Sequence, residues 1–111
     1  MIVSTTNEVA EHRITRNLGL VRGSSIRARH LGKDILAIFR NIAGGEIKEY
    51  TKMLAEAREQ AVDRMLEEAV ALNADAVVGL RFQTSTVMSG AAEMLCYGTA
   101  VLLQRDNRAT P

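Results

Sequence analysis

The stretch ALNADAVVGLRF, residues 71–82, decides the fold, because a helical pattern ends within it and a strand pattern begins. Before it, apolar residues recur at steps of three and four from Glu46 to Leu72, which is the spacing of an amphipathic helix. Asn73 stands where a residue in the left-handed conformation commonly follows the last helical turn. From Ala76 onward the side chains alternate between two faces, as they do in a strand. The stretch therefore predicts a junction between a helix and a sheet and not a functional loop.

The helix predicted over residues 46–72 has an apolar stripe and an acidic face. The stripe consists of Ile47, Tyr50, Leu54, Ala57, Ala61, Met65, Ala69 and Leu72. The opposite face carries Glu49, Lys52, Glu56, Glu59, Asp63 and Glu67. We interpret it as a solvated surface on which the acidic residues form ion pairs with Lys52 and Arg64. Arg58 falls inside the stripe and Glu68 at its edge, where a buried charge needs a partner. We expect Arg58 to contact Glu93 or a carboxylate of an adjacent subunit.

Strands are predicted before and after this helix. They cover residues 11–21, where RGSS ends the strand, residues 76–87 and residues 93–104, with a turn at Gly90 between the last two. Val78, Leu80 and Phe82 should point one way, and Val77, Gly79 and Arg81 the other. A short amphipathic helix is predicted within residues 30–45, ending at Gly44 and Gly45.

These elements predict an α+β fold with the order β-α-β-β, in which one long helix covers a small antiparallel sheet in two layers. Residues 1–105 form a single domain, and residues 106–111 form a polar tail. Both faces of the last strand are largely apolar, from Met94, Cys96, Ala100 and Leu102 to Leu95, Tyr97, Val101 and Leu103. One helix covers only one face, so we expect a second copy of the chain to cover the other.

Composition excludes several classes of protein. A single cysteine rules out an internal disulfide framework and favours a reducing, cytoplasmic location. No apolar run approaches the ~20 residues of a membrane span, so we expect no membrane partner. Basic side chains gather in residues 13–33, but this segment has no aromatic residue for base stacking, and the acidic helix opposes its field. Nucleic-acid binding is therefore disfavoured.

Several separated motifs resemble the YbjQ-like family, which carries the label "putative heavy-metal-binding". They are STT near the start, GLVRG, IAGG, the helix EYTKMLAEAREQAVDRMLEEA, LNADAVVGLRF and EMLCYGTAV, spread over residues 2–103. Asn73 departs from the glycine common in relatives. The resemblance implies a β-α-β-β subunit assembled as a ring-shaped homopentamer, and it names no activity.

The metal label directs attention to the soft and borderline ligands of the chain, which are Cys96, His12 and His30. No C-x-x-C, H-x-x-x-H or H-E-x-x-H spacing joins them, so a complete site within one subunit is not expected. A ring can bring copies of one residue together on its axis. Cys96 has apolar neighbours, and we interpret it first as a small core residue.

Polar residues of the strands and helix are the remaining candidates for a binding site. Arg58, Arg81, Glu93 and Tyr97 would line a groove between subunits if the strand register holds. The sequence therefore favours a non-catalytic homo-oligomeric module that binds a metal ion or small ligand at subunit contacts. The alternative is an enzyme whose active site is shared between adjacent subunits, with Arg58, Glu93 and Tyr97 as its first candidates.

Overall fold

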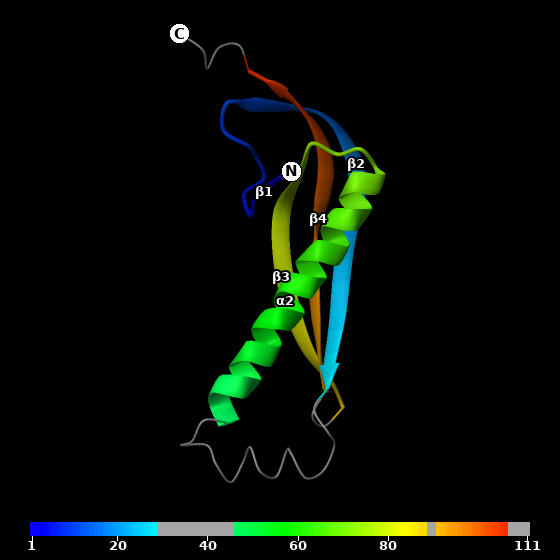
Figure 1. Cartoon of the computed structure of the whole chain (residues 1–111). Helices are drawn as coiled ribbons and strands as arrows, with labels where there is room; N and C mark the ends of the chain where they lie inside the picture. Colours follow the sequence, from blue (N-terminus) through cyan, green and yellow to red (C-terminus); the bar gives the residue numbers. More distant parts are fainter. Residues whose placement is uncertain (29–45, 89–90, 107–111) are drawn as a thin grey trace.

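The computed structural model describes residues 1–28, 46–88 and 91–106 and has two layers, a sheet and a helix (Figure 1). In chain order the elements are β1 (Ile2–Val3), β2 (His12–Ala28), α2 (Glu46–Ala71), β3 (Ala76–Met88) and β4 (Ala91–Arg105). The predicted α+β class and β-α-β-β order are confirmed. The predicted short helix, the turn at Gly90 and residues 107–111 of the tail lie outside the described residues.

The sheet has the strand order β1-β3-β4-β2. β4 pairs antiparallel with both β2 and β3, whereas the short β1 pairs parallel with β3. The sheet is therefore mixed and not wholly antiparallel as predicted. This follows from the N-terminal residues, which lie along the outer edge of β3.

The main core lies between the sheet and α2, which crosses one face diagonally and packs on β2 and β4 (Figure 1). Ala57, Ala61, Met65 and Ala69 of the predicted stripe are at most 1% exposed. Leu72 is 42% exposed, contrary to its place in the stripe, because the helix ends one residue before it. The side chains of Ile47 and Tyr50 lie outside the described residues. No helix in the described ranges has the length and hydropathy that a membrane crossing requires.

The end of α2 confirms the helix-to-sheet junction. Asn73 has a φ of 59°, its amide donates to the Val70 carbonyl at 2.9 Å, and the Ala74 amide donates to the Ala69 carbonyl at 3.0 Å. These two bonds and the left-handed residue form a Schellman motif, which satisfies carbonyls that a helix end leaves free. Ala74 also packs against the main core, so the chain enters β3 in a fixed direction.

The RGSS sequence does not end the first long strand, as predicted, because β2 continues through it to Ala28. A Cβ at Gly23 would collide with backbone atoms of Ala61 and Met65, so α2 touches β2 at this point. Ser25 is 1% exposed, and its hydroxyl donates to Gln60 Oε1 at 2.7 Å. Gly23 and Ser25 are small because α2 crosses over them, and not because the chain turns there.

A bulge at Gly79 reverses the alternation of β3. Gly79 has a φ of 65°, and the register with β4 shifts between Val78 and Arg81. Val77 therefore shares the helix-facing core with Leu80, while Val78 lies in a second small core on the opposite face. The prediction that Val78 and Leu80 share a face was wrong, although a bulge at a strand glycine is common.

Candidate functional site on the open face of the sheet

Among the described residues, no segment covers the face of the sheet turned away from α2 over the part that includes Leu20 and Ile26. Met94 and Cys96 of β4 point into the helix-facing core, so the alternate residues of β4 point the other way. We call this surface the open face; its members are Leu20, Arg22, Ser24, Ile26, Arg81, Gln83, Ser85, Glu93, Leu95 and Tyr97. Leu20 and Ile26 are 63% and 60% exposed. Tyr97, which is 36% exposed, lies between them in the strand register, so the three side chains give this face an apolar surface that a contact can cover.

One row of the open face brings two arginines beside a tyrosine. Tyr97 of β4 is paired with Arg81 of β3 on one side and with Arg22 of β2 on the other. Directly paired residues have Cβ atoms about 5 Å apart. The Arg81 guanidinium donates to the carbonyls of Thr5 and Leu80 at 2.9 and 2.8 Å, so it holds the N-terminal segment against β3. Among the described residues, the Arg22 guanidinium has no hydrogen-bond or ion-pair partner.

A second row places a carboxylate beside a hydroxyl. Glu93 is paired with Ser85 and with Ile26, and the Ser85 hydroxyl lies 3.5 Å from Glu93 Oε1. Three of the four predicted ligand residues, Arg81, Glu93 and Tyr97, thus share the open face.

Arg58 does not join this group, because it projects from α2 on the opposite side of the sheet. It lies in an exposed groove of about 400 Å³ with Glu59, Val62, Asp63 and Phe82. The expected contact between Arg58 and Glu93 was therefore wrong. The helical stripe is narrower than predicted because α2 packs on β2 and β4 and leaves its side toward β3 uncovered.

Sequence reasoning missed Arg22 as a site residue. The strand was predicted to end at residue 21, which removed Arg22 from the alternating pattern. A strand running through RGSS would have placed Arg22 on the face opposite Val21, which is fully buried under α2. The missed signal was the small residues Gly23 and Ser25, at alternate positions under the helix.

Cys96 is a core residue in this subunit. It is 0% exposed beneath α2, and burial raises the pKa of its thiol, although a hydrogen bond with the Gly23 backbone acts in the opposite direction. A protonated, covered thiol is not available to a metal from solvent. The interpretation of Cys96 as a core residue agrees with this position.

His12 lies far from Cys96, at the other end of β2. Its Nδ1 donates to the Ala10 carbonyl at 2.8 Å, and it borders a hollow of about 960 Å³ with Glu8, Glu11, Arg13 and Arg105. His12 is paired with Arg105, which lies nine positions along β4 from Cys96, or about 30 Å at ~3.3 Å per residue. His30 lies outside the described residues, which contain no cluster of three or more potential metal ligands.

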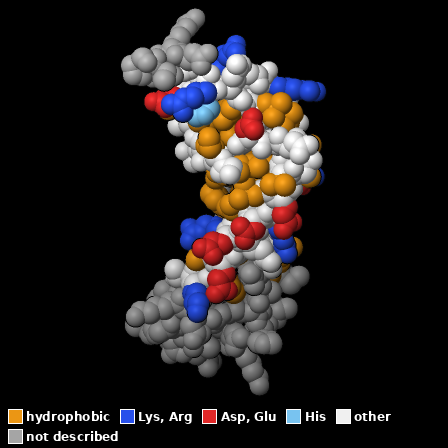
Figure 2. All heavy atoms as spheres, turned by 45° about the horizontal axis from the view of Figure 1, so that its top comes forward, with side chains coloured by type: hydrophobic (Ala, Val, Ile, Leu, Met, Phe, Trp, Pro, Cys, Tyr) orange, Lys and Arg blue, Asp and Glu red, His pale blue; other side chains and the backbone are white. Residues whose placement is uncertain are grey.

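The acidic residues Glu56, Glu59, Asp63 and Glu67 are all exposed, and Figure 2 shows acidic side chains interspersed with basic ones below the hydrophobic patch at the centre of the view. Arg64 does not pair with them as predicted. Its guanidinium donates to the Ser24 carbonyl at 2.6 Å instead.

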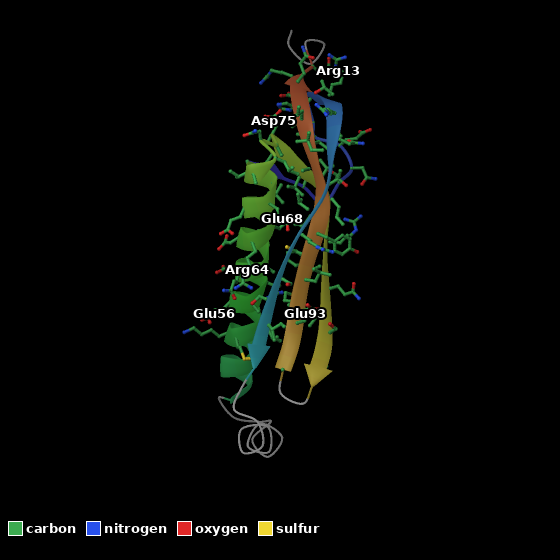
Figure 3. All side chains as sticks on the ribbon, turned by 90° about the vertical axis from the view of Figure 1, so that its right-hand side faces the viewer. Arg13, Glu56, Arg64, Glu68, Asp75 and Glu93 are labelled. Atoms are coloured by element: carbon green, nitrogen blue, oxygen red, sulfur yellow. The ribbon has the colours of Figure 1, made fainter. Side chains whose placement is uncertain are left out.

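The edge of β2 is protected by side chains of α2. Glu68 Oε1 accepts a hydrogen bond from the Arg22 amide at 3.2 Å, and the Arg64 guanidinium donates one to the Ser24 carbonyl, two residues further along the strand. Arg64 and Glu68 are labelled in Figure 3. The partner that Glu68 requires is thus a backbone amide and not a charged side chain. Edge strands often carry such protection against pairing with other chains.

Comparison with known proteins gives consistent family matches. The YbjQ_1 family, described as "Putative heavy-metal-binding", matches residues 1–104. A UPF0145 protein of Methanosarcina acetivorans is 58% identical over 91% of this chain and 95% of its own length. One from Thermosipho africanus is 53% identical over 96% and 99%. A crystal structure of a protein of unknown function from Pediococcus pentosaceus, of the DUF74 family, has a TM-score of 0.60 at 19% identity over 94% of this chain and 98% of that one. This last likeness concerns the fold alone.

Proposed function

Since the chain belongs to the YbjQ family, we propose that it is a non-catalytic cytoplasmic module whose copies form a ring, five by the family resemblance, with a metal ion or small ligand bound at their contacts. The open face is the observation that supports this proposal. It combines exposed apolar side chains with the Arg22 guanidinium, which has no partner among the described residues. A pocket completed by a neighbouring copy would use both.

The apolar part of the open face favours association. Leu20 and Ile26 are more than half exposed, and covering them would contribute about 1–2 kcal/mol each at ~25 cal/mol per Å² of apolar surface. A chain of 12.1 kDa has a small core, so it gains from such contacts.

The polar part of the open face indicates the class of ligand. The Arg22 guanidinium and the Tyr97 hydroxyl are hydrogen-bond donors on adjacent strands, which suits a carboxylate or phosphate group. A metal ion would need donors from several copies, because those of one copy do not converge in the described residues. Among the predicted metal ligands that the structure describes, only His12 is partly exposed.

Native mass measurement and elemental analysis of protein purified without a histidine tag test the proposal. Leu20→Glu and Ile26→Glu should dissociate the oligomer, because each places a charge in the covered surface. Val70→Glu is a matched control, since Val70 is 61% exposed on α2, away from the open face. A wild-type protein that remains monomeric at micromolar concentration refutes the ring. Less than one metal ion per ring refutes the metal.

An enzyme with an active site shared between adjacent subunits is the second candidate. The Ser85 hydroxyl beside the Glu93 carboxylate favours it, because a hydroxyl next to a base is the minimal arrangement for nucleophilic catalysis. Turnover of nitrophenyl ester or phosphate substrates that Glu93→Gln abolishes and Gln83→Asn preserves would support this candidate. Equal background rates for the wild type and both variants would exclude it for these substrates.

A further inference from the structure

A hollow of about 810 Å³ lies beside the edge of the sheet that β2 forms. Three elements line it, and its charged members are Arg22 of β2, Arg64, Glu67 and Glu68 of α2, and Glu93 of β4. Figure 3 shows Arg64 and Glu68 on α2, on one side of β2, and Glu93 on the other. Pockets for small molecules commonly have volumes of about 300–1,000 Å³. The hollow is therefore large enough for a small ligand.

The two guanidinium groups of the hollow keep most of their hydrogen-bonding capacity. The Arg22 guanidinium has no partner among the described residues, and Arg64 uses only Nη1, which donates to the Ser24 carbonyl at 2.6 Å. A guanidinium carries five N–H donors in a planar fork that matches a carboxylate. A carboxylate that enters the hollow finds unused donors on both arginines.

The carboxylates of the hollow do not neutralise these arginines. Within the described ranges, no ion pair joins Arg22 or Arg64 to an acidic side chain. Glu68 instead accepts a backbone amide, and Glu93 Oε1 lies 3.5 Å from the Ser85 hydroxyl. Two positive and three negative side chains give the hollow a net charge of −1, which disfavours a free phosphate, while the guanidinium groups disfavour a metal cation.

Glu67 provides a place for a positive group. Its carboxylate has no hydrogen bond or ion pair in the part of the chain that the structure describes. Ala71, the last residue of α2, lines the same hollow, and the last turn of the helix contains no basic residue. Cations are stabilised at the C-terminal end of a helix by its dipole. This part of the hollow therefore suits an ammonium group.

We propose that the hollow binds a free α-amino acid with an apolar side chain. The ligand carboxylate binds the Arg22 and Arg64 guanidinium groups, and its ammonium group binds Glu67. Its side chain packs on Leu95, which is half-buried in the wall of the hollow. This inference rests on the proposed function, because it names the small ligand. It does not need the ring, because one subunit supplies all these groups.

Calorimetric titration of the wild type with L-leucine tests the proposal. Isocaproate, which is leucine without its amino group, and isopentylamine, which is leucine without its carboxylate, are the matched ligands. Leucine should bind at least about tenfold more tightly than either of them, because each lacks one charge-assisted contact. Equal binding of leucine and either analogue overturns the proposal. Tighter binding of inorganic phosphate, or no saturable binding of leucine at millimolar concentration, also overturns it.

Two charge-removing variants place the ligand in the hollow. Arg22→Gln and Glu67→Gln should each weaken leucine binding by about tenfold or more, because each removes the partner of one ligand charge. Arg16→Gln and Glu59→Gln are the matched controls, because they make the same changes at exposed positions of β2 and α2 outside the hollow. Leucine affinities that do not differ between the site variants and their controls overturn the proposal.

The outcomes separate this inference from the proposed ring. A wild-type ring that does not bind leucine overturns the inference and leaves the oligomer standing. A monomeric wild type that binds leucine overturns the ring and supports the inference. Glu67 is not a member of the open face, so Glu67→Gln tests the site even where Arg22→Gln alters assembly. Circular dichroism confirms that each variant is folded.

Discussion

Gly23→Ala places a methyl group between β2 and α2, and its effect can be worked out from the structure. The new Cβ would overlap the Ala61 carbonyl oxygen and the Met65 amide nitrogen and would lie 3.0 Å from the Arg64 carbonyl carbon. These are backbone atoms and cannot rotate away, so α2 must move by roughly 1.4 Å to restore a contact of ~3.5 Å. Inserted methyl groups usually cost about 1–3 kcal/mol. We expect about 3 kcal/mol, because a whole helix must shift.

Thermal unfolding followed by circular dichroism at a fixed protein concentration measures this effect. A loss of about 3 kcal/mol should lower Tm by about 12 °C or more, at ~4 °C per kcal/mol for a small domain. Ser24→Ala is the control, because Ser24 points away from α2 and its carbonyl still accepts Arg64. A Tm for Gly23→Ala within about 2 °C of the control would refute the close packing of α2 on β2.

Three further predictions concern the helix end, the protected edge and the buried thiol. Asn73→Gly should raise the free energy of unfolding by about 0.5–1 kcal/mol in denaturant titrations, since glycine adopts the φ of 59° without strain, and Asn73→Ala should lower it. Glu68→Ala should cost about 1 kcal/mol and speed hydrogen exchange of the Arg22 amide, which loses its acceptor; an unchanged exchange rate would contradict the contact. Burial raises the pKa of the Cys96 thiol above 9.0, so the folded state keeps a proton that the unfolded state loses. Stability should therefore fall as pH rises above about 9, and Cys96→Ser should remove this component; equal slopes in the two proteins would show that other groups cause it.

The local periodicity of the sequence predicted the long helix and the strands, whereas the extent of β2 and the placement of Arg58 depend on how α2 packs on the sheet. The bounds of α2, the two faces of β4 and the left-handed Asn73 were all predictable, because they depend on residues close together in the chain. The continuation of β2 through RGSS was not, since it depends on where α2 crosses that strand. The placement of Arg58 failed for the same reason. The open face was only partly predictable, because its row of Arg81, Tyr97 and Arg22 requires the register of three strands.

The protection of the β2 edge shows how a helix can take the place of a strand. Arg64 and Glu68 are four residues apart, which is about 6 Å along a helix, and Ser24 and Arg22 are two residues apart, which is about 6.6 Å along a strand. Because these distances nearly match, the Arg64 guanidinium can donate a hydrogen bond to the Ser24 carbonyl while the Glu68 carboxylate accepts one from the Arg22 amide. In the sequence the same spacing predicts an ion pair within the helix. The structure uses the two side chains as a neighbouring strand would use its backbone, so a further strand could join β2 here only by breaking both bonds.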